Sequence, residues 1–225
     1  GNHFIEIDEN KDGERFLVIH SGSRNLGKQV AEYYQAQAVR YCLDNGISVS
    51  QSLAYLEGTM RDNYLHDMRI CQKYAELNRR WIGTLLMDFL DDKSELSGAI
   101  ESVHNYIGDD NIIRKGAVSS LKNELLIIPI NMRDGSLLCR GKGNADWNFS
   151  APHGAGRILG RSEAKRVLSV EEFQETMEGV FSTTVGQHTL DEAPSAYKPM
   201  DEIVSNIGDT VEILQIIKPI YNFKA

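Results

Sequence analysis

The stretch FIEIDENKDGERFLVIH, residues 4–20, contains the pattern that decides the fold of this chain. Its two ends, FIEI and RFLVIH, are rich in Phe, Ile, Leu and Val, which favour strands. The segment DENKDG between them contains Asp, Asn and Gly, the residues of tight turns. This stretch therefore predicts two short strands joined by a turn, and the rest of the chain can be placed around them.

The sequence after this pair of strands changes to helical spacing. We expect one helix from about Leu26 to Asp44 and a long helix from about Arg61 to Leu90. Apolar residues recur near helical spacing along the second helix, namely Met68, Cys71, Ala75, Ile82, Leu85, Leu86 and Phe89. The block from about residue 26 to 92 is therefore predicted to be a packed helical insertion, with Cys71 in its core.

Strand-like runs return after the helical block. They are AIESVHNYIG (99–108), NIIRKGAV (111–118), ELLIIPI (124–130), SLLCRG (136–141) and EILQIIKPI (212–220), the last followed by a terminal tail. Ser169 stands three residues before Glu172, which predicts a capping box and a short helix. We therefore expect a single α+β domain over residues 1–225, with mixed strands around a central cleft and the helical insertion between them.

Composition limits the class of protein. Of the 225 residues, 41% are hydrophobic and 25% are charged, as in soluble globular proteins. There is no apolar run long enough to span a bilayer and no signal peptide. The three cysteines form no CxxC pair, which favours the reducing cytoplasm. The net charge of −8 argues against a broadly basic nucleic-acid surface but leaves room for a local one.

Two loops repeat one pattern. HSGSR (20–24) and HGAGR (153–157) both read His, three small residues and Arg, and each precedes a predicted helix. Small residues expose backbone N–H groups, helix N-termini favour anions, and arginine binds phosphate with two hydrogen bonds. Two such loops predict two phosphate-facing corners of one site. Taken singly, each is equally compatible with a glycine-rich turn beside a surface arginine.

The positions of the histidines strengthen the case for a site. Four of the six lie at a strand end or beside small or amide residues: His3, His20, His104 and His153. Neutral imidazole binds manganese, iron or zinc, so four such histidines favour a metal or phosphoryl-transfer site. His66, beside Asp67, is expected to be an ordinary helix residue. His188 is ambiguous, and a structural role is the more common one for such a residue.

Several longer motifs carry a family resemblance. GNHFIEI, HSGSRNLG, HN, IIPINMRDGSLLCRGKGNADWNFSAPHGAGR and DEAPSAYKPMDEI occur in this order along the chain. Together they resemble the signatures of the RtcB family of RNA ligases. The resemblance extends over the whole chain, which corresponds to about the later half of a typical member.

The resemblance implies a reaction. Members of the family join an RNA 3′-phosphate or 2′,3′-cyclic phosphate end to a 5′-hydroxyl end, with GTP and manganese, in RNA repair or tRNA splicing. His153 would attack the α-phosphate of GTP and become guanylylated, and imidazole is a good nucleophile near neutral pH. The small residues Gly154, Ala155 and Gly156 would let a nucleotide phosphate lie against the backbone.

Further roles follow from the resemblance, position by position. The metal-binding histidines would be His3, His20 and His104. Asn2, Glu6 and Asn105 would lie beside the nucleotide phosphates and metals. Ser136 would lie in the guanosine pocket, and Tyr197 and Lys224 would make further nucleotide contacts. Candidates for holding RNA phosphates are Arg24, Arg157 and Arg161, which helix-flanking surface charge would also explain. From its position alone, Lys224 would be a frayed terminal residue.

One departure limits what the resemblance implies. In the family, an aspartate and a cysteine from an upstream motif complete a two-manganese site, and no such motif precedes GNHF here. The first residue is not Met, and we expect this chain to be the later part of something longer. Three hypotheses therefore remain: an RNA ligase with its upstream half elsewhere, a single-metal enzyme that uses the retained site, and a nucleotide- or RNA-end-binding fragment without turnover. The complete protein is expected to be a cytoplasmic monomer that binds RNA and no membrane.

Overall fold

The computed structural model describes residues 3–91 and 98–224, and it divides the chain into two compact units. The first unit consists of Gly1–His20 together with Ser97–Ala225, and the second of Ser21–Leu96. The second unit matches the helical insertion predicted from the sequence. The predicted pair of strands therefore ends at the point where the second unit begins.

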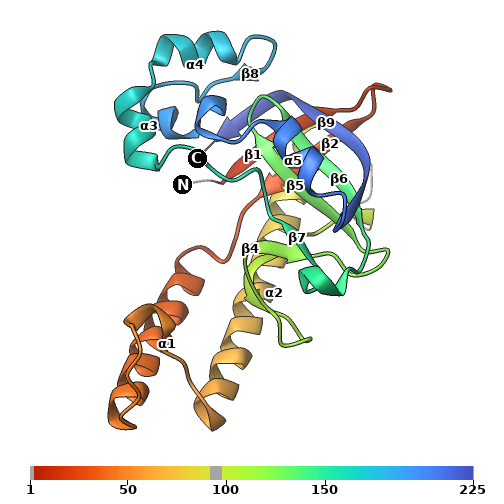
Figure 1. Ribbon diagram of the computed structural model, residues 1–225. Helices are drawn as coiled ribbons and strands as arrows, with labels where there is room; N and C mark the ends of the chain where they lie inside the picture. Colours follow the sequence, from red (N-terminus) through yellow and green to blue (C-terminus); the bar gives the residue numbers. More distant parts are fainter. Residues whose placement is uncertain (1–2, 92–97, 225) are drawn as a thin grey trace. The chain divides into compact units, whose positions relative to one another are not determined.

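The main sheet of the first unit has six strands (Figure 1). Five of them follow the order β2-β1-β9-β6-β5, and β8 pairs with β9. Their bounds are β1 Phe4–Glu9, β2 Arg15–His20, β5 Leu125–Asn131, β6 Gly135–Gly141, β8 Phe181–Ser182 and β9 Val211–Lys224. All neighbours are antiparallel except β8 and β9. The last strand of the chain thus lies at the centre of this sheet, between β1 and β6.

A second sheet has three strands in the order β3-β4-β7. They are β3 His104–Ile107, β4 Ile113–Ser119 and β7 Ser150–Pro152, and both pairs are antiparallel. The predicted strand AIESVHNYIG is shortened to its second half. Because β4 lies between the other two strands, the residues next to the start of β3 and the end of β7 are brought to one end of this sheet.

Short helices cover parts of the first unit. They are the α-helices α3 Arg161–Val167, α4 Val170–Thr176 and α5 Met200–Asn206, and the 3₁₀ helices η3 Ala145–Trp147, η4 Gln187–Glu192 and η5 Pro194–Ala196. One apolar cluster joins β5 and β6 to Ile203 and Ile207 at the end of α5. Another packs Met132 against Phe173 of α4 and Leu190 of η4. The backbone N–H of Glu172 donates to the Ser169 side chain at 3.1 Å, so the predicted N-cap of α4 is confirmed.

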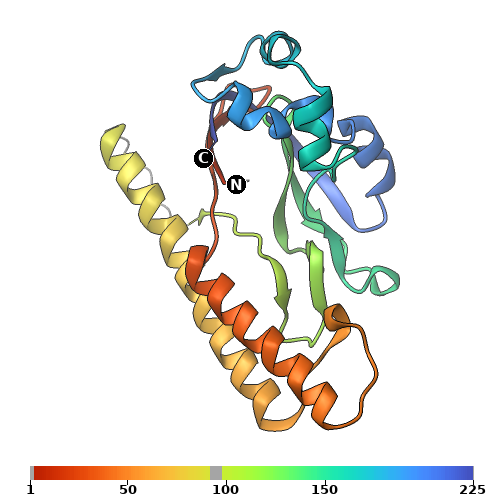
Figure 2. The ribbon, with the colours of Figure 1, turned by 90° about the vertical axis from the view of Figure 1, so that its left-hand side faces the viewer.

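The second unit is a pair of long helices joined by a segment that contains one short 3₁₀ helix (Figure 2). They are α1 Arg24–Asp44 and α2 Gly58–Phe89, and the 3₁₀ helix η1 covers Gln51–Leu53. Tyr34 of α1 donates a hydrogen bond of 2.8 Å to Asp67 of α2. Cys42 and Cys71 are both buried, which confirms the core position predicted for Cys71.

The C-terminal end of the chain differs from the sequence prediction. The expected tail after residue 220 continues as strand through Lys224, because β1 supplies hydrogen-bond partners along its whole length. Phe4 is paired with Lys224 in this register, so the first and the last strand of the chain lie side by side. Lys224 is thus a buried residue of the central strand, and not the frayed end that its position alone would suggest.

The predicted fold class is confirmed as α+β, with a helical insertion close to the expected bounds. The single domain and the central cleft stay predictions. None of the helices within residues 3–91 and 98–224 combines the length and the apolar character that crossing a membrane requires.

Candidate functional site

Four histidines of the first unit form a row of neighbouring rings. The ring centroids of His3 and His20 are 6.2 Å apart, those of His20 and His104 are 5.5 Å apart, and those of His104 and His153 are 5.0 Å apart. The ring of His20 also stacks on Phe4, with centroids 5.0 Å apart. The structure thus brings together the four histidines that the sequence places at strand ends.

Strand pairing explains why residues so far apart in sequence meet here. His20, the last residue of β2, is opposite Phe4, so His3 and His20 lie at the same end of the hairpin. In the second sheet, His104 is opposite Val118 of β4, and Val118 is opposite Ala151 of β7. His153 follows β7 directly, so His104 and His153 approach across β4.

Asn105 and Gly116 fix the backbone beside His153. The side-chain oxygen of Asn105 accepts a hydrogen bond of 3.2 Å from the backbone N–H of Gly116. Gly116 has a φ of +72°, which L residues with a side chain rarely adopt, and its missing Cβ would lie 3.7 Å from the His153 ring. The sequence contained this signal in RKGAV, but we did not assign Gly116 a role from it.

The row is electrostatically suited to neutral imidazole. Burial, followed by the charges of His104, His3, Lys224 and His153, lowers the pKa of His20 to about 3. His20 is therefore neutral at pH 7, which is the form that binds metals. However, no group of three His, Cys, Asp or Glu side chains in the described part of the chain has the geometry to hold a metal ion.

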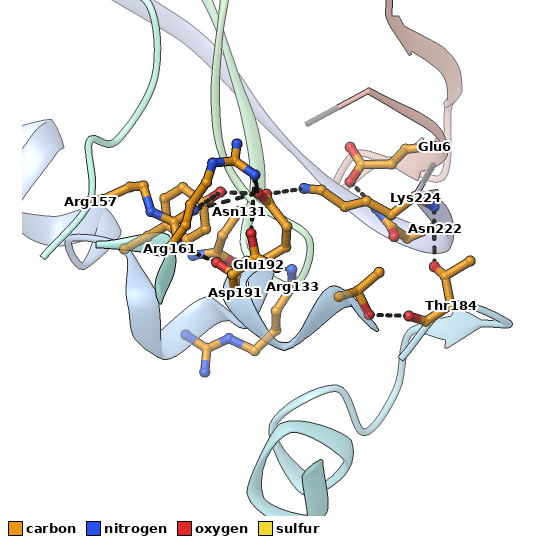
Figure 3. A network of polar contacts seen from close by, with 12 residues as sticks. Glu6, Asn131, Arg133, Arg157, Arg161, Thr184, Asp191, Glu192, Asn222 and Lys224 are labelled. Atoms are coloured by element: carbon orange, nitrogen blue, oxygen red, sulfur yellow. Dashed lines mark hydrogen bonds and ion pairs between the residues drawn. The ribbon is translucent and has the colours of Figure 1, made fainter. Parts of the chain in front are cut away.

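A second group of polar side chains is centred on a buried carboxylate, Glu192 (Figure 3). Its Oε2 accepts from the Tyr197 hydroxyl at 2.6 Å and is 2.9 Å from the Lys224 ammonium. Its Oε1 is 3.1 Å from Arg161 and 3.5 Å from Arg157. The neighbouring Asp191, also buried, pairs with Arg161 and Lys165, at 3.0 and 3.1 Å. Four residues that the resemblance singles out, Arg157, Arg161, Tyr197 and Lys224, thus meet at one acidic pair.

The contacts of Arg157 and Arg161 bear on the role expected for them. Arg157 donates to the backbone oxygens of Leu159 and Asp191, and its guanidinium lies 4.8 Å from the centroid of the Tyr197 ring. The two arginines are therefore held by groups of the chain itself, and their contact with RNA phosphate stays a prediction. The burial of Tyr197, followed by its hydrogen bond to Glu192, raises the pKa of its hydroxyl, so that it remains a donor.

A second acidic pair, Glu6 and Asp8, lies on the buried face of β1. Glu6 accepts a hydrogen bond from Asn222 of β9, and Figure 3 shows Glu6 and Asn222 beside Lys224. Burial, the charge of Asp8 and weaker opposing effects of Lys224 and Asn222 leave the pKa of Glu6 at about 8. Burial raises the pKa of Asp8 to about 7, and its two carboxylate oxygens have no hydrogen-bond partner among the described residues.

The small residues after His153 pack against other segments of this chain. The backbone N–H of Ala155 donates to the carbonyl oxygen of Pro129 at 3.1 Å, and a Cβ on Gly154 would lie 3.1 Å from the same oxygen. The carbonyl of Gly156 accepts from Lys198 at 3.1 Å. A side chain at position 154 would thus crowd the backbone of β5, whatever else the loop binds.

The remaining predicted residues are dispersed. Ser136 of β6 is fully buried, and its hydroxyl has no hydrogen-bond partner in the described part of the chain. Arg24 is an exposed residue at the start of α1 in the second unit. His66 is exposed on α2 and 3.1 Å from Asp67, as expected, and His188 is an exposed residue of η4. Asn2 lies outside the described residues.

Sequence reasoning missed three acidic residues. Asp191 and Glu192 stand in DEAPSAYKP, a motif from which we selected only Tyr197. The alternation of FIEIDE places Phe4, Glu6 and Asp8 on one face of β1, and the burial pattern of β1 shows that this face is the buried one. The sequence signal for Asp8 was therefore its position on the same strand face as a buried aromatic residue.

Comparison with known proteins agrees with this arrangement. The family model described as tRNA-splicing ligase RtcB matches residues 1–225, and this chain belongs to the RtcB family. RNA-splicing ligase RtcB1 of Escherichia coli is 32% identical over 98% of this chain, and RNA-splicing ligase RtcB of Escherichia coli K12 is 31% identical over the same share. tRNA-splicing ligase RtcB of Aeropyrum pernix is 28% identical over 96% of it. The chain covers 58%, 58% and 56% of the lengths of these three relatives, respectively.

Proposed function

We propose that this chain carries the nucleophile and the nucleotide-binding part of an RNA ligase that joins a 3′-phosphate or 2′,3′-cyclic phosphate end to a 5′-hydroxyl end. The observation that carries the proposal is the row of four histidine rings that ends at His153, which the small residues of the HGAG loop follow in the sequence. Membership of the RtcB family supports the reaction class, since its relatives are named RNA-splicing or tRNA-splicing ligases.

In the proposed reaction a ring nitrogen of His153 attacks the α-phosphorus of GTP. A nitrogen–phosphorus bond forms, the bond to the β-phosphate oxygen breaks, and pyrophosphate leaves. An oxygen of the RNA 3′-phosphate then takes the GMP from His153. Finally, the 5′-hydroxyl attacks the activated 3′-phosphate, and GMP leaves with the bonding electron pair. A 2′,3′-cyclic phosphate must first be hydrolysed to the 3′-phosphate.

The residues around His153 have separable tasks in this proposal. Lys224 brings a positive charge close to Glu6 and His20, where a nucleotide would be bound, and the fold keeps this lysine buried. Glu6, Asn105, Ser136 and Tyr197 would orient the nucleotide. Asn2, which lies outside the described residues, would join them. Arg24, Arg157 and Arg161 would contact RNA phosphates.

Manganese belongs to the proposal through the family resemblance. It would supply positive charge at the transferred phosphate, and His3, His20 and His104 are the residues of this chain that would hold it. An aspartate and a cysteine, which the resemblance places in an upstream motif, would complete the set. This requirement follows from charge, because neutral imidazoles cannot offset the repulsion between two divalent ions.

Covalent labelling tests the proposal directly. The chain is incubated with manganese and GTP labelled at the α-phosphate, with or without the upstream half of a relative, and is analysed on a denaturing gel. We expect label on the wild-type chain, none on His153→Ala, and none after chelation of the metal. His66→Ala is the matched control, because His66 is exposed on the helical unit, and it should keep its label. Label on His153→Ala would show that the nucleophile is another residue.

A second candidate function is nucleotide or RNA-end binding without turnover. It is favoured by the observation that no three-donor metal geometry occurs among the described residues. This function predicts saturable binding of GTP by the chain, with no covalent label under any metal condition. Ligation of 3′-phosphate RNA to 5′-hydroxyl RNA by the chain alone would exclude it.

A further inference from the structure

Four charged or polar side chains contact the buried carboxylate of Glu192. Its carboxylate is almost completely inaccessible, at 2% exposure. One oxygen contacts the Lys224 ammonium and the Tyr197 hydroxyl, and the other contacts Arg157 and Arg161. A carboxylate has about four lone-pair sites, so these four donors leave no acceptor free for a substrate.

The four donors come from four separate segments of the first unit. Arg157 lies in the loop after β7, and Arg161 is the first residue of α3. Tyr197 follows η5, and Lys224 ends β9, 32 positions beyond Glu192 in the sequence. Figure 3 shows Lys224 reaching across to the Glu192 group, with Glu6 and Asn222 near its base. A single carboxylate therefore fixes the relative positions of these segments.

Lys224 connects this carboxylate to the histidine row. Its ammonium lies 5.2 Å from the centroid of the Phe4 ring, which in turn stacks on His20. Its charge acts on both His20 and Glu6. A buried ammonium needs a counter-charge, and Glu192 supplies it at 2.9 Å. Glu192 therefore fixes the direction of a residue that reaches from the acidic group to the histidine row.

We propose that Glu192 is a positioning residue for nucleotide binding, which acts by holding the Lys224 ammonium directed toward the histidine row and by holding the Tyr197 hydroxyl beside it. This proposal rests on the function proposed above, because the ligand it serves is the nucleotide. Glu192 itself touches no ligand. Its effect on the nucleotide passes through Lys224, so removal of either partner should remove the same interaction.

A double-mutant cycle on GTP affinity tests this dependence. We expect Glu192→Gln and Lys224→Gln each to weaken GTP binding at least about tenfold. The double variant should bind no more weakly than either single variant, because both changes break the same contact. Glu212→Gln is the matched control, since Glu212 pairs with Arg140 on the surface, and it should bind GTP as the wild type does. Losses that multiply in the double variant would overturn the proposal.

A conservative variant separates positioning from general support of the fold. Glu192→Asp keeps the charge but shortens the side chain, so we expect it to recover part of the GTP affinity that Glu192→Gln loses. If Glu192→Gln does not fold, the double-mutant cycle is measured with Glu192→Asp, Lys224→Gln and the variant that combines these two changes. Affinities that follow only the melting temperatures of the variants would assign Glu192 a purely structural role and overturn the proposal.

The Lys224 ammonium supplies a readout that does not require GTP. In the wild-type chain labelled with ¹⁵N-lysine, we expect one ammonium resonance protected from exchange, which disappears in Lys224→Gln and shifts in Glu192→Asp. If the wild type binds no GTP, the proposed function fails, and this signal still tests the contact. A wild-type chain that binds GTP but shows no protected ammonium would overturn the positioning role while leaving the proposed function intact.

Discussion

Two buried aspartates of the same unit, Asp8 on β1 and Asp191 on η4, differ in what surrounds them. Both are almost inaccessible, at 0% and 5% exposure. Burial raises the pKa of Asp191, but hydrogen bonding and charge from Lys165, with a further contribution from Arg161, outweigh it and leave that pKa below its ordinary value. Burial raises the pKa of Asp8 to about 7, with nothing to oppose it. Burial alone therefore does not determine the charge of an acidic residue, because the available donors decide it.

The same contrast extends to their partners, Glu192 and Glu6. Glu192 is surrounded by two arginines, a lysine and a tyrosine, whereas Glu6 accepts from Asn222 and lies beside a second acid. The residues opposite Asp8 on the flanking strands are Phe16 and Pro219, which offer no charge. One acidic pair thus binds cationic side chains from several segments, and the other is buried without a charged partner on the flanking strands.

The largest expected effect on stability comes from the loss of Glu192, the carboxylate that two arginines, a lysine and a tyrosine contact. Glu192→Ala should lower the free energy of unfolding by about 3–5 kcal/mol, because it leaves the buried ammonium of Lys224 and the guanidinium of Arg161 without that counter-charge. Denaturation in urea measures this change. Glu212→Ala, which breaks a solvent-exposed pair with Arg140, should cost at most about 1 kcal/mol. Similar losses for the two variants would contradict the contrast between buried and exposed pairs.

The next largest expected effect on stability concerns Asp8 and depends on pH. The pKa of Asp8 in the fold, about 7, lies above its ordinary value of 3.8, so the fold favours the protonated form. Its contribution to stability is therefore full below about pH 4 and is lost as the pH rises through 7. Asp8→Asn removes this loss and should stabilise the chain relative to the wild type at pH 8, on the order of 3 kcal/mol, with a much smaller difference at pH 4.

Unfolding curves at both pH values check this expectation. Asp209→Asn is a suitable control, because Asp209 lies exposed in the turn before β9 and its replacement should change the free energy of unfolding little. An Asp8→Asn effect that does not change with pH would mean that Asp8 is ionised in the fold, with a partner outside the described residues.

The smallest expected effect is the difference in stability between variants of two serines, Ser169 and Ser136. Ser169 caps α4 and accepts a hydrogen bond from Glu172, so Ser169→Ala should cost about 1 kcal/mol. The buried hydroxyl of Ser136 has no partner among the described residues, so Ser136→Ala should change stability by less than about 0.5 kcal/mol. If Ser136 faces the guanosine, its variant should instead weaken GTP binding, whereas Ser169→Ala should not. Equal losses of stability would show that Ser136 has a partner in the fold.

Much of the fold could be predicted because its signals are local. The hairpin of β1 and β2, the capped helix α4 and the long helix α2 each follow from apolar spacing and turn or capping residues within a short window. The end of the chain could not be predicted in this way. Residues 221–224 continue as strand because β1, more than two hundred residues away, supplies the partner hydrogen bonds.

The candidate site was predictable only in part for the same reason. The four histidines were selected by their places at strand ends, and the motifs identified them further. Glu192 and Asp8 carry no local mark of their importance, because an acid in a loop motif and an acid in a strand are each usually exposed. Their significance comes from the residues that the fold places around them.

The sequence by itself determined the strand and helix segments, the family, and the identity of the residues in the histidine row. The tertiary structure decided that the histidine rings are neighbours, that Lys224 is buried in a central strand, and that one acidic pair is surrounded by cations while the other is not. The physical reason is the range of the forces. Backbone propensity and capping act over a few residues, whereas burial and electrostatic pairing depend on segments that only the folded chain brings together.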